Sequence, residues 1–387
     1  MSKIKIETLT AVHIGSGETL QYNNDYVKGK DADGDHILGI IDPKKVLNII
    51  GEEHINEWVT FIECKKPTSE IVRKYAPHAT IKDYAKRVIL FYADKSTSEL
   101  KEHIHDGMGR PYIPGSSIKG AIRTALLSSL VEKNDEGKIC VKDRQGNCKH
   151  NNLIINAKIV ETKHFSSIDD NIKKQLHITD SNSDMFRFLQ VGDAYFGKNY
   201  EVALRMVNIN ERVRNGFWDE SKQQMIEAIC PEDESFFEMK INASGYNLSQ
   251  EKKAVHAMPP EMKSISDLFL AINRHTQSLI EREIEYWKNR TDKDDSGKTD
   301  DYVECMSDIL DKTNSCKTGQ ECVLRIGHGS GWRFITGAWA EDFDNFQNLV
   351  IPAARPKNYN YEQFDFPKSR RVSDGCEVLG FVRLTLC

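Results

Sequence analysis

Two strand-like segments near opposite ends of the chain each run into a glycine-rich loop that contains a histidine. Lys3–Ile14 alternates apolar and polar side chains and leads into His13–Gly17, while Cys322–Ile326 leads into Gly327–Gly331. An alternation of period two predicts strands, and the glycines after them predict loops. Two such segments favour a duplicated module of mixed helix and sheet. The match is short, so chance similarity stays open as the alternative.

The length of 387 residues favours two domains with elaborations. We place the first module at residues 1–200 and the second at residues 201–387. The second contains a long amphipathic segment, Ile265–Trp287, whose apolar residues recur at helical spacing. This mixture predicts an α+β fold with helical insertions and glycine-rich loops.

Composition excludes several classes of protein. Hydrophobic residues make up 39% and charged residues 29%, and the net charge is −5. No apolar run is long enough to span a membrane, and the negative charge argues against a nucleic-acid binder that works by charge alone. Nine cysteines without a CxxC pair indicate reduced thiols in a cytoplasmic protein. The spacings of the cysteines and histidines match no common zinc pattern, so we expect neither a metal nor a cofactor.

The string GRPYIPGSSIKGAIRTAL, residues 109–126, predicts an extended piece that breaks at Pro-Gly and continues as a helix. A serine at the break can cap the helix, whose free N–H groups and partial positive charge attract anions. A lysine and an arginine four residues apart would share one flank of the helix. An ordinary capped helix with solvated charges is the simpler alternative. The candidate phosphate ligands are Gly115, Ser116, Ser117, Lys119 and Arg123.

The two glycine loops are the second group of candidates. Glycines let the backbone lie flat against a sugar-phosphate chain, and an aromatic beside an arginine offers base stacking with a phosphate contact. Core packing is the alternative for the tryptophan of the second loop. The candidates are His13, Gly15, Ser16 and Gly17 in the first loop, and Gly327, Gly329, Gly331, Trp332 and Arg333 in the second.

Three segments of the chain resemble the RAMP superfamily of CRISPR-associated proteins: residues 109–126, the N-terminal strand with its loop, and the C-terminal glycine loop. Length, order and spacing resemble most the family of fifth subunits of type III-A Csm effector complexes. The resemblance covers both ends and the centre of the chain. The string PGSSIKGAIRTAL carries it most specifically.

The resemblance implies two ferredoxin-like, RRM-related modules. It also implies a non-catalytic RNA-binding subunit that holds the 3′ part of the guide crRNA, caps the backbone filament and supports maturation of the guide 3′ end in antiviral defence. The implied partners are the guide crRNA, the adjacent backbone RAMP subunit, other subunits of the effector complex and host nucleases. One alternative stays open: a metal-independent endoribonuclease that processes guide precursors, with His13 as its general base.

Overall fold

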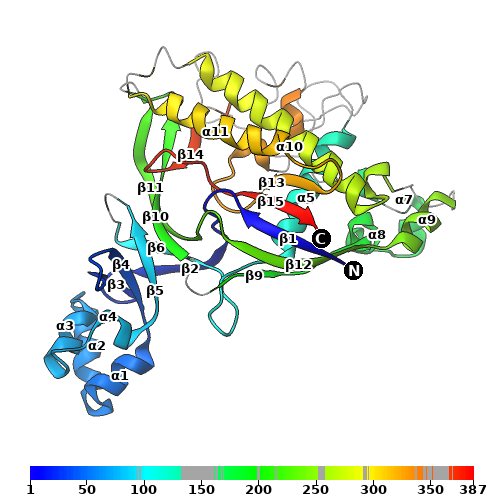
Figure 1. The fold of residues 1–387 in the computed structure, drawn as a ribbon. Helices are drawn as coiled ribbons and strands as arrows, with labels where there is room; N and C mark the ends of the chain where they lie inside the picture. Colours follow the sequence, from blue (N-terminus) through cyan, green and yellow to red (C-terminus); the bar gives the residue numbers. More distant parts are fainter. Residues whose placement is uncertain are drawn as a thin grey trace, which may run out of the picture.

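The computed structural model shows a mixed helix and sheet protein in which two curled sheets lie beside each other and a small helical lobe extends from one of them (Figure 1). Its two ends are adjacent, because the backbone N–H of Cys387 donates to the carbonyl of Lys3. Among the described residues no helix is both long and apolar enough to cross a membrane. The described residues are 1–93, 95, 97–131, 161, 164–166, 168, 170–197, 201–213, 216–251, 258–290, 294, 296–335, 338–342, 346, 351, 366, 367 and 369–387.

The first sheet has five strands and is antiparallel at every pairing. The N-terminal strand lies at its centre, and its alternation buries Ile4 and Ile6 on one face while Lys3 and Lys5 project from the other. The strand order is β13 (Glu321–Arg325), β15 (Phe381–Leu386), β1 (Ser2–Thr8), β12 (Glu234–Ile241) and β8 (Leu189–Val191).

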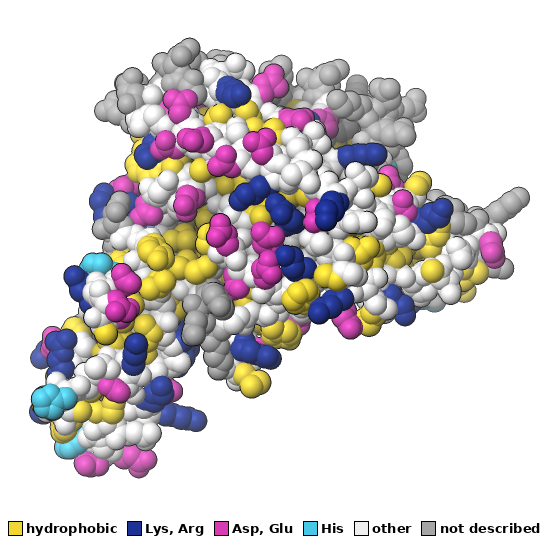
Figure 2. All heavy atoms as spheres, in the orientation of Figure 1, with side chains coloured by type: hydrophobic (Ala, Val, Ile, Leu, Met, Phe, Trp, Pro, Cys, Tyr) yellow, Lys and Arg dark blue, Asp and Glu magenta, His cyan; other side chains and the backbone are white. Residues whose placement is uncertain are grey.

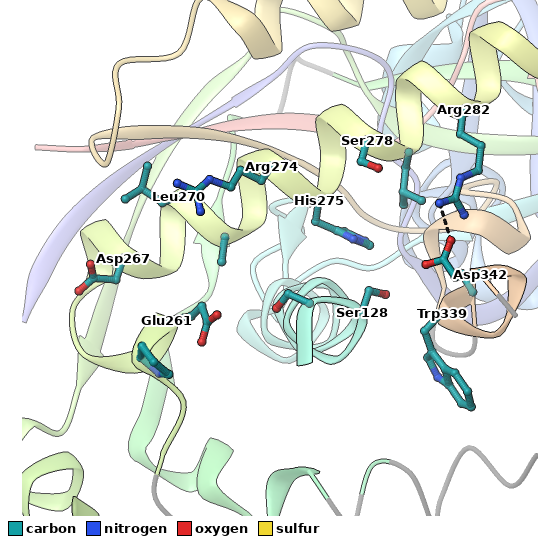
Figure 3. A pocket seen from close by; sticks show the side chains of 15 residues that line it. Ser128, Glu261, Asp267, Leu270, Arg274, His275, Ser278, Arg282, Trp339 and Asp342 are labelled. Carbon is teal, nitrogen blue, oxygen red and sulfur yellow. Dashed lines mark hydrogen bonds and ion pairs between the residues drawn. The ribbon is translucent and has the colours of Figure 1, made fainter. Parts of the chain in front are cut away.

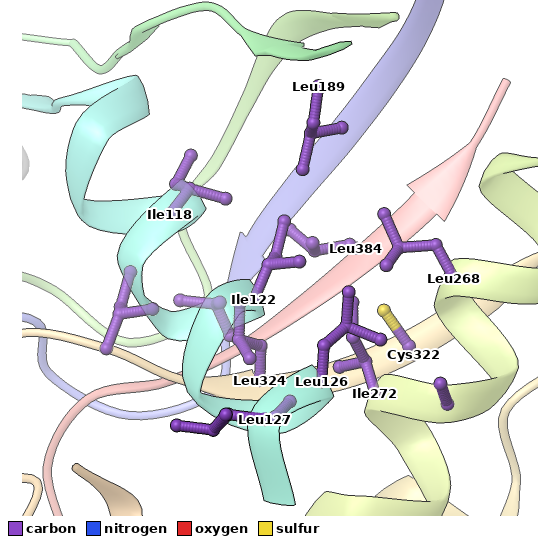
Figure 4. Close-up of a cluster of buried hydrophobic side chains, with 14 of the residues drawn as sticks. Ile118, Ile122, Leu126, Leu127, Leu189, Leu268, Ile272, Cys322, Leu324 and Leu384 are labelled. Atoms are coloured by element: carbon purple, nitrogen blue, oxygen red, sulfur yellow. The ribbon is translucent and has the colours of Figure 1, made fainter. Parts of the chain in front are cut away.

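Two helices cover the buried face of this sheet. Helix α5 (Gly115–Leu130) and helix α10 (Ile265–Lys288) bring their apolar stripes together over β13 and β15 (Figure 4). The amphipathic helix predicted from Ile265 is confirmed, and the Ser264 hydroxyl caps it by accepting from the N–H of Asp267. The side chains in contact include Ile118, Ile122, Leu126, Leu268, Ile272, Leu324 and Leu384.

The second sheet curls beside the first. Its central strand β10 is buried along almost its whole length, which a strand covered on both faces requires. It pairs in parallel with β5, while β11 pairs in parallel with β6. The order is β2 (Gly15–Gln21), β6 (Glu99–His103), β11 (Trp218–Ile229), β10 (Glu201–Asn210), β5 (Ala85–Tyr92), β4 (His36–Ile41) and β3 (Tyr26–Lys30), with β14 (Ser369–Ser373) also on β10.

The remaining elements are short. A helical lobe packs around Trp58 and Ile71 beside β3 and β4 (Figure 1), and it consists of α1 (Pro43–Ile50), η1 (Glu52–His54), α2 (Ile55–Glu63), α3 (Thr68–Tyr75) and α4 (Ile81–Tyr84). The others are β7 (Tyr112–Ile113), α7 (Asp170–Gln175), α8 (Asp180–Ser183), η2 (Met185–Phe188), β9 (Ala194–Tyr195), α9 (Ala243–Glu251), η3 (Pro260–Met262), α11 (Lys298–Asn314), η5 (Trp332–Phe334) and η6 (Ala338–Asp342).

The α+β class predicted from the sequence is confirmed. The two modules, at residues 1–200 and 201–387, do not each form a sheet of their own, because both sheets combine strands from both halves. Strand β1 pairs with β12 and β15, although both lie more than 200 residues away in the chain. An alternating pattern predicts a strand and its buried face, but it carries no information about the pairing partner.

Candidate functional site: two glycine loops and a row of histidines

The two glycine loops that resemble each other in sequence touch each other in the structure. The N–H of His328 donates to the carbonyl of His13 at 2.9 Å. Gly327 has φ +79°, and a Cβ there would lie 2.5 Å from that same carbonyl, so only glycine permits the approach. Gly380 ties both loops together, since it accepts from the N–H of Ile326 and donates to the carbonyl of Ala11. The two segments that carry the candidates His13, Gly15, Gly17, Gly327 and Gly329 therefore lie side by side, with His13 itself buried.

The N-terminal loop is held from below by β11 and β6. Val12 and Ile229 exchange two backbone hydrogen bonds. The imidazole of His13 donates from Nδ1 to the carbonyl of Glu227 at 2.6 Å. The N–H of Ile14 donates to Nδ1 of His103 at 3.1 Å. The chain is thus fixed at three successive residues, and Gly15, Ser16 and Gly17 beyond them are exposed. The sequence predicts a loop at these three residues, but they form the start of strand β2, whose pairing with β6 is irregular between Gly15 and Thr19.

Four imidazoles lie in a row beneath the loops. The ring centroid of His13 lies 5.8 Å from that of His328 and 6.1 Å from that of His103, and His105 continues the row at 5.8 Å from His103. Burial lowers the pKa of His13 to about 4, although its bond to the Glu227 carbonyl opposes the shift. Burial and the neighbouring His13 likewise lower the pKa of His328 to about 4. Both rings are therefore neutral at physiological pH.

A buried ionic network lies under the histidines. Arg87 donates from Nε and Nη2 to the fully buried carboxylate of Glu227 at 2.7 and 2.8 Å, and from Nη2 to Glu102 at 3.0 Å. Oxygens of Glu102 and Glu227 and a ring nitrogen of His105 lie within 4.8 Å of one another, a spacing that could hold a metal ion. The guanidinium already bridges both carboxylates, so a cation would have to displace it. We therefore assign the network to the core and retain the expectation of no metal.

A cavity of about 180 Å³ opens between the loops. Its wall combines backbone, two imidazoles, two glutamates and one lysine, with Lys101 on β6 opposite Thr19 of β2. Among the residues that the structure describes, Lys101 has no carboxylate partner. The lining residues are His13, Gly15, Gly17, Glu18, Thr19, Lys101, Glu102 and His328.

Positive and negative side chains are mixed on the open face of the five-stranded sheet, within the described part of the chain. Figure 2 shows Lys and Arg side chains interspersed with Asp and Glu over β1 and β15. Lys5 pairs with Glu234 at 2.7 Å, and Lys3 lies over the ring of Phe236 at 4.1 Å. This part of the surface lacks the continuous basic stripe that phosphates would require.

A larger cavity of about 430 Å³ lies between α5 and α10 (Figure 3). Arg282, at one end, is paired with Asp342 at 2.6 Å. Burial lowers the pKa of His275 to about 4, so this ring is neutral. Acidic side chains such as Glu261 share this wall with Arg274, so the described lining of neither cavity has a surplus of positive charge to attract a phosphate. The smaller cavity differs because exposed glycine backbone lines it.

The end of the C-terminal loop turns inward, which corrects two predictions. The ring of Trp332 lies 5.2 Å from that of Phe346 and 4.9 Å from that of Phe366, so the half-buried ring packs against the core rather than standing free to stack on a base. Arg333 is buried, and its guanidinium donates to Glu283 and Glu341, each at 2.6 Å. A tryptophan and an arginine after a glycine loop could contact RNA or pack inside the protein. The sequence fits both roles, and only the contacts in the structure distinguish them.

Glu283 of α10 organises this buried region. Its carboxylate accepts from Arg333 at 2.6 Å, from Nη2 of Arg370 at 2.8 Å and from the hydroxyl of Tyr302 at 2.8 Å. Burial alone would raise the pKa of Glu283, but Arg370 and Arg333 outweigh it and lower the pKa to about 2. The carboxylate is therefore charged and pairs with both arginines, while Glu341 supplies a second negative charge beside Arg333.

The N-terminus of α5 is already occupied by a carboxylate. Helix α5 begins at Gly115, whose N–H donates to Oδ1 of Asp193 at 2.7 Å. A Cβ at Gly115 would lie 2.2 Å from the carbonyl of Val191. The predicted serine cap is wrong, because the N-cap residue is Pro114, whose side chain accepts no hydrogen bond. Ser116 and Ser117 lie in the first turn, with Ser116 exposed.

Lys119 and Arg123 share a flank of α5 as predicted, but both contact protein. Lys119 donates to the carbonyl of Leu189 at 2.8 Å, and burial lowers its pKa. Arg123 pairs with Glu161 at 3.2 Å and Asp184 at 2.7 Å, and its guanidinium lies 4.3 Å from the ring centre of Phe165. The prediction that these side chains hold phosphates does not fit this geometry, in which they fasten α5 to its neighbours.

We therefore expect Arg123→Ala to lower the melting temperature by several degrees, because it removes two half-buried ion pairs and a cation–π contact together worth about 1–3 kcal/mol. The salt dependence of RNA binding should stay unchanged. Thermal unfolding and salt titrations check both expectations, and Arg123→Lys should recover only part of the loss because an ammonium cannot stack or bridge as a planar guanidinium does. An unaltered melting temperature with a shallower salt slope would restore the phosphate role.

The fold and the paired loops define an α+β protein with a loop-lined candidate RNA interface. Residues 5–333 match the model of the RAMP superfamily, which is most of the chain. The chain therefore belongs to the RAMP superfamily.

Curated relatives match over parts of their length. The "CRISPR system Cms protein Csm5" of Enterococcus italicus is 26% identical over 152 residues, which cover 32% of this chain and 42% of that protein. The Csm5 of Streptococcus thermophilus is 48% identical over 42 residues, 11% of this chain and 12% of that protein. The matched segments thus span less than half of the relatives' length.

Two solved structures match over nearly the whole chain. The crystal structure of Csm5 from T. onnurineus has a TM-score of 0.63 at 18% identity and covers 98% of this chain and 99% of that one. A chain of a Csm–crRNA–target RNA ternary complex of a type III-A CRISPR–Cas system, solved by cryo-electron microscopy, has a TM-score of 0.60 at 18% identity, with 99% and 100% covered. At this identity the likeness establishes the fold.

Proposed function

We propose that the chain is a non-catalytic RNA-binding subunit of a type III-A CRISPR effector complex in the cytoplasm. It holds the 3′ part of the guide crRNA, caps the filament of backbone RAMP subunits and supports guide 3′-end maturation. Its partners are the guide crRNA, the adjacent backbone subunit, other subunits of the complex and the host nucleases that trim the guide.

Membership of the RAMP superfamily and the likeness to a chain of a Csm–crRNA–target RNA complex support this proposal. The strand order adds to it. Apart from the edge strand β13, the first sheet runs in the order β15, β1, β12, β8. Counted along the chain, these are the fourth, first, third and second of the four strands, and α5 and α10 cover one face of the sheet. This is the order of a ferredoxin-like unit, into which the second sheet is inserted, and we propose that description for the first sheet.

One observation carries the proposal: two glycine loops from opposite ends of the chain form a single exposed surface beside Lys101, which has no carboxylate partner among the described residues. Gly15, Gly17 and Gly327 leave the backbone accessible, so that N–H groups can approach phosphates closely. Lys101 supplies the positive charge at the cavity between the loops.

The same geometry gives little support to the endoribonuclease alternative. Cleavage by two histidines needs one of them protonated to donate to the leaving group. With pKa values of about 4, His13 and His328 are both neutral near pH 7. The loops are therefore proposed to bind RNA without cutting it.

The test is a gel assay of the purified chain, alone and with its neighbouring subunits, using labelled guide-repeat RNA with and without divalent metal. We expect retention of intact RNA, more strongly in the assembled complex, since the net charge of −5 limits affinity of the chain alone. Metal-independent cleavage that His13→Ala abolishes would overturn the proposal.

A single lysine tests the interface more narrowly. Lys101→Ala should weaken RNA binding and lower the salt slope by about 0.7, the value for one phosphate contact on a single strand. Fluorescence anisotropy at several salt concentrations measures the slope. Lys82→Ala, an exposed lysine on the helical lobe, is the matched control and should leave both quantities as in the parent chain. Equal slopes for both variants would remove Lys101 from the interface.

A further inference from the structure

The cavity between the glycine loops presents a hydrogen-bond acceptor whose orientation the protein fixes. His13 is 2% exposed, and its Nδ1 must carry the proton because its partner, the Glu227 carbonyl, can only accept. In the neutral ring Nε2 is then unprotonated. Among the residues the structure describes, Nε2 has no hydrogen-bond donor, and it lies against Gly15, where a Cβ would be 3.4 Å away.

Several groups around the cavity can contact a nucleotide's sugar and phosphate, beside the carboxylates of Glu18 and Glu102. Lys101 lies in the same cavity and offers a cation to a phosphate. Gly15 and Gly17 leave room for a backbone to approach, and a Cβ added at Gly17 would meet no described atom within 4 Å. His328 donates from Nε2 to Gln224 at 3.1 Å, so its own tautomer is fixed as well. The cavity thus combines a phosphate contact with a lone-pair acceptor at one nucleotide's reach.

We propose that this cavity recognises the ribose 2′-hydroxyl, with Nε2 of His13 accepting the hydroxyl proton in a hydrogen bond, and that it thereby selects RNA over DNA. The 2′-hydroxyl is the group that distinguishes the two nucleic acids, and a buried acceptor that it fails to satisfy costs binding energy. The inference rests on the proposed RNA-binding function and adds a specificity-determining residue to it. His13 binds the hydroxyl here and activates no attack, because its neighbour His328 is not protonated to complete a cleavage reaction.

Two carboxylates also line the cavity. Glu102 already accepts from Arg87 and Ser16, which leaves Glu18 as the competing acceptor. It is exposed, and its carboxylate could also accept from a hydroxyl. Its backbone N–H donates to the Ser16 hydroxyl at 3.1 Å, but no bond of its side chain is present among the described residues. An exposed carboxylate that nothing orients distinguishes weakly between the 2′-hydroxyl of ribose and the 2′-hydrogen of deoxyribose. A buried nitrogen in a fixed position distinguishes them strongly, because leaving it without a donor costs binding energy.

The experiment compares oligouridylate with oligodeoxyuridylate, each about 20 nucleotides long, by fluorescence anisotropy with the full chain. The two probes have the same bases and differ only at the 2′ position. We expect the parent chain to bind the ribose probe about 3- to 10-fold more tightly for each 2′-hydroxyl that the cavity reads. Equal affinity for both probes would overturn the inference and leave RNA binding intact, while no binding of either would overturn the proposed function as well.

Two variants assign the selection to a residue. His13→Asn places an amide N–H near the position of Nδ1, preserving the bond to Glu227, and removes the acceptor at Nε2, so the two probes should bind equally. Glu18→Gln should keep the full preference. Circular dichroism and melting temperature verify that both variants fold. If a variant does not fold, the comparison of the two probes with the parent chain still tests the inference. A preference lost in Glu18→Gln and kept in His13→Asn would overturn the role of His13.

Discussion

Glu283→Ala is expected to destabilise the protein by about 3–5 kcal/mol, the usual result of leaving a buried charge without its partner. The substitution removes the one carboxylate that accepts from both Arg333 and Arg370, and it also leaves the Tyr302 hydroxyl without its acceptor. Arg333 would keep its ion pair with Glu341, but the buried guanidinium of Arg370 would lose the carboxylate it pairs with. Chemical denaturation followed by tryptophan fluorescence measures the loss, and poor recovery of folded protein would be its extreme form.

Glu285→Ala is the matched control, since the same substitution two residues away replaces an exposed glutamate on the same helix. It should change the stability by less than about 0.5 kcal/mol. Similar stabilities for the two variants would contradict the assignment of Glu283 as the charge that holds this part of the core.

The destabilisation should also depend on pH in a defined direction. The folded pKa of Glu283, about 2, lies below its ordinary value of 4.5. The stabilisation is therefore complete above pH 4.5 and is lost as pH falls from there toward 2. The difference in unfolding free energy between the parent chain and Glu283→Gln should narrow as the pH falls from about 4.5 toward about 2, whereas a constant difference would indicate a loss of packing alone.

Gly327→Ala is expected to weaken RNA binding at least about tenfold, or ~1.4 kcal/mol. The new Cβ would lie 2.5 Å from the carbonyl of His13, and alanine is strained at φ +79°. The two loops would have to separate, which breaks the hydrogen bond from His328 and displaces the surface that the proposed function assigns to RNA. Anisotropy with guide-repeat RNA measures the effect.

Gly34→Ala separates backbone strain from loop separation. Gly34 has φ +91° in an exposed turn, and an added Cβ would meet no described atom within 4 Å. Its substitution should cost about 1 kcal/mol of stability and leave RNA affinity unchanged. If Gly327→Ala bound RNA as tightly as Gly34→Ala, the joined loops would not be the RNA surface.

Some features of the fold and the candidate site can be predicted from local sequence patterns. The alternation of Ile4 and Ile6, the helical stripe that begins at Ile265 and the glycines that interrupt strands at both ends are all visible in the sequence. Each is a local signal, because side-chain period and glycine's access to positive φ depend only on neighbouring residues. The likeness of the two loops in sequence favours a duplicated module, but nothing in it predicts that the loops touch.

The cationic candidates behave differently. A lysine and arginine at the start of a helix, or an arginine after a glycine loop, attract phosphate and carboxylate alike. Which anion they meet depends on residues far along the chain: Asp184 for Arg123 and Glu283 for Arg333. Lys101 carries no motif, yet the cavity makes it the cation beside the loops.

The sequence by itself determined the α+β class, the helix from Ile265 and the family resemblance that the match over residues 5–333 confirms. Only the tertiary structure decided that both sheets draw strands from both halves, that four histidines form a row and that the charged candidates on α5 bind protein. The physical reason is the separation along the chain over which each interaction acts. Periodicity and turn chemistry act over a few residues, whereas strand partners, ion pairs and the orientation of an imidazole are set by groups that folding brings together from distant parts of the chain.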